Sequence, residues 1–185
     1  MTHSARHTVL SEIAPFGDDT DDLRVVIETP KGSRNKYSYD PECDCIELST
    51  VLPEGMVFPY DFGFIPSTLG EDGDPLDVLI LMDTPVVPGC VIRARLIGVI
   101  EAEQSENGHW VRNDRLIAVA THAQTYDQAE RLSDLRPRLV REIEQFFASY
   151  NTLRDRKFKA GDEGGPKKAR ALVEAGIKKF KKRRK

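Results

Sequence analysis

The chain has 185 residues, 39% of them hydrophobic, which is enough for one compact domain with a substantial core and too few for two domains of ordinary size. Its formal net charge of −3 creates no global field that would attract nucleic acid or an anionic membrane, so we expect neither as a partner. No apolar stretch approaches the roughly 20 residues that span a bilayer, and the N-terminus lacks an apolar signal region. Three cysteines, an odd number, argue against a disulfide framework, and we expect a soluble cytoplasmic protein.

Short extended segments follow an N-terminal lead-in at residues 1–22, which ends in an acidic run. They are rich in β-branched or aromatic residues and are bounded by Pro, Gly, Asn or Asp. The predicted strands are 23–29, 36–40, 45–51, 57–64, 76–82, 91–102 and 115–120. Because no helical pattern lies between them, they predict a closed or strongly curled antiparallel sheet instead of βαβ units.

Helical patterns come late in the sequence. Between residues 136 and 150, apolar residues recur on one helical face, and a second helix is expected at 166–180 because Pro166 suits a first helical turn. The predicted fold class is therefore α+β, a small barrel with C-terminal helices beside it. We expect a single domain at 23–180 and a basic tail at 181–185, which is either solvated or a docking site for nucleic acid or an acidic partner.

An acidic turn leads directly into the apolar strand at 76–82. Asp72, Asp74 and Asp77 crowd negative charge there, and such charge is tolerable when a multivalent cation compensates it. Hard carboxylate oxygens are the ligands that Mg²⁺ prefers. In an ideal strand Asp77 would face away from the other two, so convergence requires Gly73 and Pro75 to bend the chain. The alternative is an ordinary Asp/Gly/Pro turn without an ion.

The turn, with the order Asp-Gly-Asp-Pro-Leu-Asp, resembles the hallmark motif of the soluble family I inorganic pyrophosphatases. Segments 25–30, 58–75, 88–100 and 146–150 support the resemblance, which covers nearly the whole chain after residue 22. It implies an oligonucleotide-binding-like (OB-like) five-stranded antiparallel barrel flanked by C-terminal helices. It also implies Mg²⁺ as cofactor, pyrophosphate as substrate and a bacterial homo-oligomer, with a hexamer favoured.

The resemblance also implies roles for individual acidic residues. Asp72 and Asp77 are similar to direct metal ligands, and Asp74 to the candidate base for the attacking water. Glu28 is similar to a carboxylate that reaches the metals through water. In such a site, metal ions neutralise the substrate and make hydroxide available.

Cationic and hydroxyl groups complete the expected site. Lys36 and Tyr150 look like phosphate contacts, and Arg115 stands where the family usually has Lys. Its guanidinium offers phosphate a fork of donors, which suits stabilisation of charge on the leaving phosphate.

The chain departs from the family pattern at the second acidic motif, where the expected metal-binding Asp has become Asn113. Asn brings an oxygen without charge, and the neighbouring Asp114 could supply the carboxylate if the loop is bulged. Two alternatives to pyrophosphate hydrolysis stay open. One is a catalytically weakened barrel that binds phosphate or oligonucleotides, and the other is a hydrolase of another phosphoanhydride, such as a nucleoside triphosphate.

Overall fold

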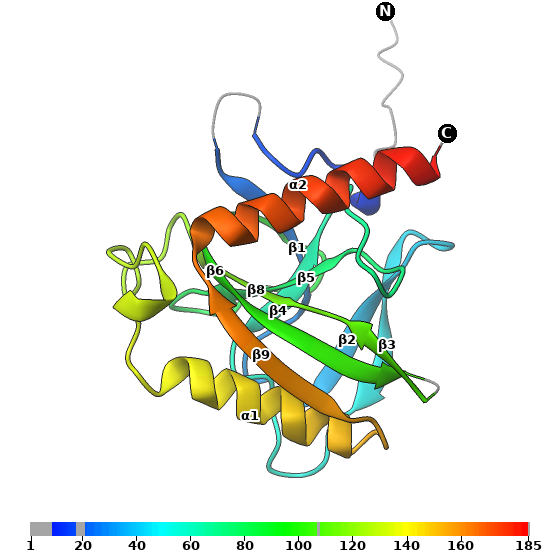
Figure 1. The fold of residues 1–185 in the computed structure, drawn as a ribbon, viewed down its shortest axis with the longest axis vertical. Helices are drawn as coiled ribbons and strands as arrows, with labels where there is room; N and C mark the ends of the chain where they lie inside the picture. Colours follow the sequence, from blue (N-terminus) through cyan, green and yellow to red (C-terminus); the bar gives the residue numbers. More distant parts are fainter. Residues whose placement is uncertain (1–8, 18–20, 107, 185) are drawn as a thin grey trace, which may run out of the picture.

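The computed structural model describes residues 9–17, 21–106 and 108–184 (Figure 1). Parts of the expected acidic lead-in, and Lys185 of the expected tail, lie outside these ranges. The helices and strands are η1 (Leu10–Glu12), β1 (Leu23–Thr29), β2 (Asn35–Asp40), β3 (Cys45–Val51), β4 (Asp61–Ile65), β5 (Leu76–Leu81), β6 (Val91–Glu106), β7 (His109–Arg112), β8 (Arg115–Ala120), η2 (Leu132–Asp134), α1 (Leu139–Thr152), β9 (Phe158–Gly164) and α2 (Pro166–Arg183).

Five strands of the described part of the chain close into a barrel in the order β1, β4, β5, β8, β6 and back to β1. The fifth of these strands in sequence therefore lies between the third and the fourth, a Greek-key closure of the OB type. The predicted α+β class and OB-like barrel are confirmed. The expectation of a purely antiparallel barrel needs one correction, because β5 and β8 run parallel, with Val78 opposite Leu116.

Several strands differ from their predicted bounds. β4 begins only at Asp61 instead of residue 57, since Pro59 lacks the amide that a strand ladder requires. β6 extends past residue 102 to Glu106, because β7 and β9 pair with its second half. β7 and β9 were not predicted. β9 reads FKAGDEG, whose glycines and charges hide its strand character.

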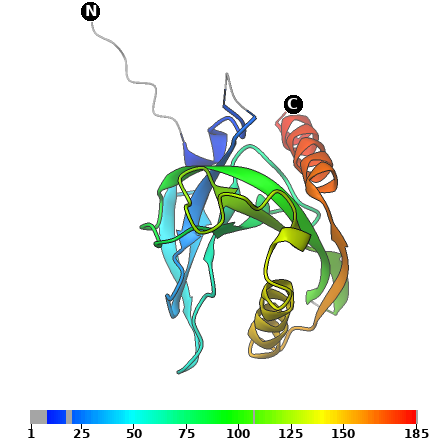
Figure 2. The same cartoon turned by 90° about the vertical axis from the view of Figure 1, so that its left-hand side faces the viewer.

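The two helices lie at opposite ends of β9, so that α1, β9 and α2 follow one another along one side of the barrel (Figures 1 and 2). α1 buries Leu139, Val140, Ile143 and Phe147 on the face that the periodicity predicted. Its Phe146 packs on Phe58 with ring centroids 5.0 Å apart. This aromatic layer fixes α1 beside the loop that precedes β4.

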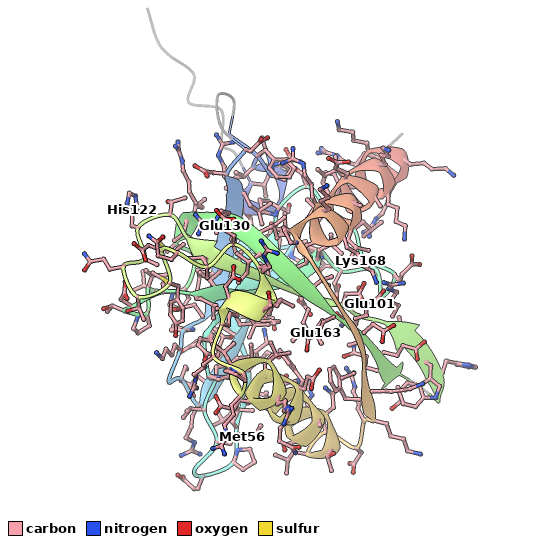
Figure 3. All side chains as sticks on the ribbon, turned by 60° about the vertical axis from the view of Figure 1, so that its left-hand side comes forward. Met56, Glu101, His122, Glu130, Glu163 and Lys168 are labelled. Carbon is pink, nitrogen blue, oxygen red and sulfur yellow. The ribbon has the colours of Figure 1, made fainter. Side chains whose placement is uncertain are left out.

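α2 begins at Pro166, as predicted, and is anchored to the barrel near that end. Lys168 Nζ lies 2.5 Å from Glu101 Oε2 of β6, and Figure 3 labels both side chains. The helix continues three residues beyond the expected end, so Lys181, Lys182 and Arg183 of the expected tail form its last turn. These three basic residues therefore belong to a helix that is anchored to β6 of the barrel.

Residues 9–17 of the expected lead-in contact the barrel. Leu10 donates its backbone N–H to Asp44 Oδ1 at 2.9 Å, and Ser67 donates its own to the carbonyl of Ser11 at 2.8 Å. Glu12 is thereby brought near the end of α2. Within the described ranges, no helix is both long and apolar enough to cross a membrane.

Asp61, at the start of β4, is a fully buried carboxylate that the site described below does not use. Its Oδ1 accepts long hydrogen bonds of 3.4 Å from the backbone N–H groups of Lys31 and Val86, and its Oδ2 has no partner among the described residues. Burial raises the pKa of Asp61 above its ordinary value of 3.8, although the two N–H groups oppose the shift. The folded state therefore binds this proton more tightly than the unfolded chain does.

Ionisation of Asp61 therefore lowers the free energy of unfolding as the pH rises from about 4 past the raised pKa of this carboxyl. We expect the free energy of unfolding of Asp61→Asn to exceed that of the parent protein by a margin that grows by about 1 kcal/mol from pH 4 to pH 8, because the amide carries no charge to bury. Urea unfolding at several pH values measures this gain. Asp162→Asn, at an exposed position on β9, is the matched control and should follow the parent at every pH. A gain that is equal at pH 4 and pH 8 would contradict the role of ionisation.

Candidate active site

A cleft of 530 Å³ lies between the barrel, the acidic turn, α1 and the end of α2. Most of the residues singled out in the sequence line it. They are Glu28, Lys36, Asp74, Asp77, Asn113, Arg115 and Tyr150. A smaller cavity of 120 Å³ is lined by Asp72, Asp77 and Asp114, among others. Asp77 therefore lines both spaces, while Asp72 and Asp114 line only the smaller one.

The acidic turn is held by its own backbone. Gly73 has φ +93°, a conformation that favours glycine, and Asp72 Oδ1 accepts the N–H of Asp74 at 3.2 Å. Gly70 donates its N–H to the carbonyl of Asp74 at 2.7 Å, which closes the loop. Asp74 is exposed, whereas Asp77, already inside β5, keeps only 22% of its side chain exposed.

The electrostatics of the turn disfavour bare carboxylates. Burial, followed by repulsion from Asp77, raises the pKa of Asp72 to about 6. Burial also raises the pKa of Asp77, which the guanidinium of Arg115 opposes. Among the residues that the structure describes, no three acidic, histidine or cysteine side chains form a ready-made metal cluster. The turn thus concentrates negative charge without bringing the three carboxylates to one point.

Arg115, from β8, is the centre of the cleft's hydrogen-bond network and is only 4% exposed. Its Nη1 lies 2.6 Å from Asp77 Oδ2 and also donates to the carbonyl and side-chain oxygens of Asn113. Its Nη2 reaches Gln104 Oε1 at 3.4 Å, and the guanidinium carbon lies 4.6 Å from the centre of the Phe147 ring. The Nε of Arg115 is buried without a partner in the described part of the chain.

Lys36, from β2, is the second buried cation, with 8% exposed. Its Nζ lies 3.0 Å from Glu28 Oε2 and 4.8 Å from the centre of the Phe62 ring. The other oxygen of Glu28 accepts the backbone N–H of Tyr39 at 2.7 Å. The ammonium also donates to the carbonyl of Tyr37 at 2.5 Å, so Glu28, this carbonyl and the ring of Phe62 together define where it sits in the cleft wall.

The structure separates Asn113 from Asp114. Asn113 lines the large cleft and touches Arg115, whereas both oxygens of Asp114 are engaged elsewhere. Asp114 Oδ1 accepts the N–H of Ala102 at 3.1 Å, and Oδ2 accepts Arg112 Nε at 2.8 Å. Asp114 thus joins β6 to the loop before β8, and its carboxylate does not reach the large cleft.

Tyr150 and a set of arginines form the outer wall. The Tyr150 hydroxyl accepts a hydrogen bond of 2.5 Å from Arg154 Nη1, and its ring lies 6.0 Å from that of Phe58. Arg154, which the sequence did not single out, lines the cleft, and so do Arg183 and Arg184 of the expected basic tail, which the sequence did not place at the site. The i, i+4 spacing of Tyr150 and Arg154 could have indicated that they share a face. For the residues at the end of α2 no local signal exists, because their position depends on how the helix packs on the barrel.

Comparison with known proteins extends over the same elements. The model of the inorganic pyrophosphatase family matches residues 25–181. The inorganic pyrophosphatase of Thermus thermophilus is 40% identical over 146 residues, which cover 78% of this chain and 81% of the relative. That of Streptomyces coelicolor is 41% identical over 163 residues, covering 85% and 94% respectively. The crystal structure of inorganic pyrophosphatase from Thermus thermophilus superimposes with a TM-score of 0.86 at 35% identity, covering 94% of this chain and 99% of that one.

Proposed function

The chain belongs to the inorganic pyrophosphatase family, and from this premise we propose that it hydrolyses pyrophosphate to two phosphate ions with Mg²⁺ as cofactor. The observation that carries the proposal is a single cleft in which Asp74 and Asp77 lie together with the buried cations Lys36 and Arg115. Carboxylates suit a hard cation, and buried cations suit an anionic diphosphate. The same cleft therefore contains groups that suit a metal cation and groups that suit an anionic diphosphate.

The donor chemistry of the turn fits Mg²⁺. The raised pKa of Asp72 reflects burial and like-charge repulsion, which a divalent cation would relieve. We assign Asp72, Asp74 and Asp77 as the carboxylates that would hold Mg²⁺, Asp72 from the smaller cavity, Asp74 from the large cleft and Asp77 from both, with Asn113 as an uncharged oxygen donor. We assign Asn113 in preference to Asp114 because Asn113 lines the large cleft together with Asp74 and Asp77, whereas Asp114 does not. Bound Mg²⁺ supplies charge neutralisation and a lowered pKa for its water.

Arg115 links the metal ligands to the substrate. It now pairs with Oδ2 of Asp77, and a cation that bound this oxygen would displace the guanidinium. The guanidinium would then be free to donate to a phosphate oxygen. Its buried Nε, which has no partner among the described residues, is a further donor that a phosphate oxygen would satisfy, and a buried donor without a partner costs about 1–3 kcal/mol.

The remaining roles follow from the positions of the side chains. Asp74, exposed at the cleft, accepts the proton of the attacking water as a new P–O bond forms. The bridging P–O bond breaks, and its electron pair leaves with the second phosphate, whose charge Lys36 and Arg115 stabilise. Tyr150 contributes a hydroxyl to the phosphate, and Glu28 holds the ammonium of Lys36 in place.

The test is phosphate release from pyrophosphate with Mg²⁺, compared with release from ATP under the same conditions. We expect clear turnover of pyrophosphate and little of ATP. No turnover above background by freshly metal-loaded protein would refute the proposal, and preferred cleavage of ATP would favour a hydrolase of another phosphoanhydride. Oligonucleotide binding at low salt without any turnover would favour the binding barrel.

We further propose that the chain works in the cytoplasm as a homo-oligomer, a hexamer. Exposed apolar side chains such as Val57, Val87 and Val91 would be covered by association. The three cysteines are free, which suits a reducing compartment. Sedimentation gives the mass directly, and a monomer at micromolar concentration would contradict the oligomer.

A further inference from the structure

The C-terminal half of α2 lies against the acidic turn. The carbonyl oxygen of Gly176 accepts the backbone N–H of Leu69 at 3.1 Å, and Lys179 Nζ forms an ion pair with the carboxylate of Glu71. Arg183 Nη1 donates to the carbonyl of Gly73 at 3.2 Å. The three helix residues are spaced by three and four positions, so they lie on one face of α2. That face follows the turn from its base to its tip.

The approach at the base of the turn is close. A Cβ atom at position 176 would lie 2.8 Å from Leu76 Cδ1 and 3.3 Å from Thr68 Cβ, so the Leu76 side chain or the helix would have to shift to admit one. Thr68 Oγ1 in turn accepts the N–H of Leu76 at 3.0 Å, which joins the two ends of the turn. α2 therefore packs on both ends of the turn as well as on its tip.

Two properties of the acidic turn, its like charges and its glycine, favour opening of the turn. Glu71, Asp72, Asp74 and Asp77 carry like charges over seven residues, and Gly73 at its tip is the residue type with the greatest backbone freedom. The like charges favour an open turn when no cation is bound. Its own hydrogen bonds oppose this opening, and α2 is placed to add a second support.

We propose that α2 holds the acidic turn in the conformation that binds Mg²⁺ and that Lys179 is a positioning residue for this site. The inference rests on the proposed function for the identity of the ion. Lys179 lines the small cavity beside Asp72, and it does not line the cleft assigned to pyrophosphate. Its effect on the ion therefore passes through Glu71 and the backbone of the turn.

The sign of the effect separates positioning from simple electrostatics. Removing a cation beside an acidic site should tighten Mg²⁺ binding if Lys179 acts only through its charge. If Lys179 positions the turn, its removal should weaken binding instead. The two accounts thus predict opposite shifts of the Mg²⁺ dissociation constant for Lys179→Met.

The experiment is calorimetric titration of metal-free full-length protein with MgCl₂. We expect Lys179→Met to raise the Kd roughly three- to tenfold, the low end for an outer partner of a metal ligand, because this ion pair is about half exposed. Lys179→Arg, which keeps the pair, should restore the parent value. Lys178→Met, an exposed neighbour with the same charge change, is the matched control and should leave the Kd unchanged or slightly lower.

A second readout is kcat at saturating Mg²⁺, which should stay within twofold of the parent in Lys179→Met. A Kd for Lys179→Met equal to or below that of Lys178→Met would overturn the positioning role while leaving pyrophosphate hydrolysis intact. A parent protein that binds no Mg²⁺ would overturn both the positioning role and the proposed cofactor. A parent that binds Mg²⁺ without cleaving pyrophosphate would overturn the proposed function alone.

Discussion

Asp74→Asn is expected to lower kcat for pyrophosphate hydrolysis by about 10²- to 10⁴-fold, the range typical of a lost general base. Asn has nearly the same shape as Asp but cannot accept the proton of the attacking water. Two of the hydrogen bonds that shape the turn use the backbone N–H and carbonyl of this residue, which the substitution keeps. Phosphate release at saturating pyrophosphate and Mg²⁺ measures the loss.

Two comparisons make the result for Asp74 specific. Thermal unfolding of Asp74→Asn should match that of the parent within the roughly 0.5 kcal/mol typical of surface substitutions, since the side chain is exposed. Asp162→Asn changes the same charge at a site away from the cleft and should keep full turnover. If Asp74→Asn were fully active, another group would have to take the proton, and Asp74 would have no place in the chemistry.

The acidic turn could be found from the sequence because its signal is local. Asp72, Asp74 and Asp77 lie within six residues, and Gly73 and Pro75 between them predict a bend in the chain. Sequence spacing could not say which aspartates share a space. The structure places Asp74 in the cleft and Asp72 in the small cavity, since the bend at Gly73 turns their side chains apart.

The choice between Asn113 and Asp114 required the fold. Neighbouring residues near a strand point to opposite faces, so an error of one residue in register exchanges their environments. In the structure, Arg112 and the N–H of Ala102 hold Asp114 outside the cleft, and Asn113 turns toward Arg115. The segment is too short for its sequence periodicity to predict which of the two residues faces the cleft.

The barrel strands could be predicted because their runs of β-branched residues are buried on both faces, as in β8. β9 could not, because pairing with β6 makes it a strand and its own composition does not. The same reason hides Lys179 and Arg183. A basic helix end looks solvated in sequence, and only the packing of α2 on the barrel brings it to the acidic turn.

Arg115→Met should reduce both turnover and stability. Turnover should fall by about 10²- to 10³-fold, because a donor to the developing charge on phosphate is lost. The free energy of unfolding in the absence of divalent ions should fall by about 3–5 kcal/mol, because Asp77 would keep a mostly buried charge without its partner. Phosphate release and urea unfolding measure the two effects separately.

The pH dependence of Arg115→Met follows from the pKa of Asp77, which burial raises and Arg115 opposes. Without the guanidinium that pKa rises further, so the folded variant takes up a proton that the unfolded chain lacks near neutral pH. The stability loss should therefore be largest at pH 8 and shrink toward pH 4, where the unfolded chain also begins to take up this proton near the ordinary pKa of 3.8. Arg115→Lys keeps the charge but not the fork of donors, and it should recover more stability than turnover. A variant Arg115→Met that lost stability yet kept full turnover would limit Arg115 to a structural role and leave Lys36 as the cation that serves the phosphate.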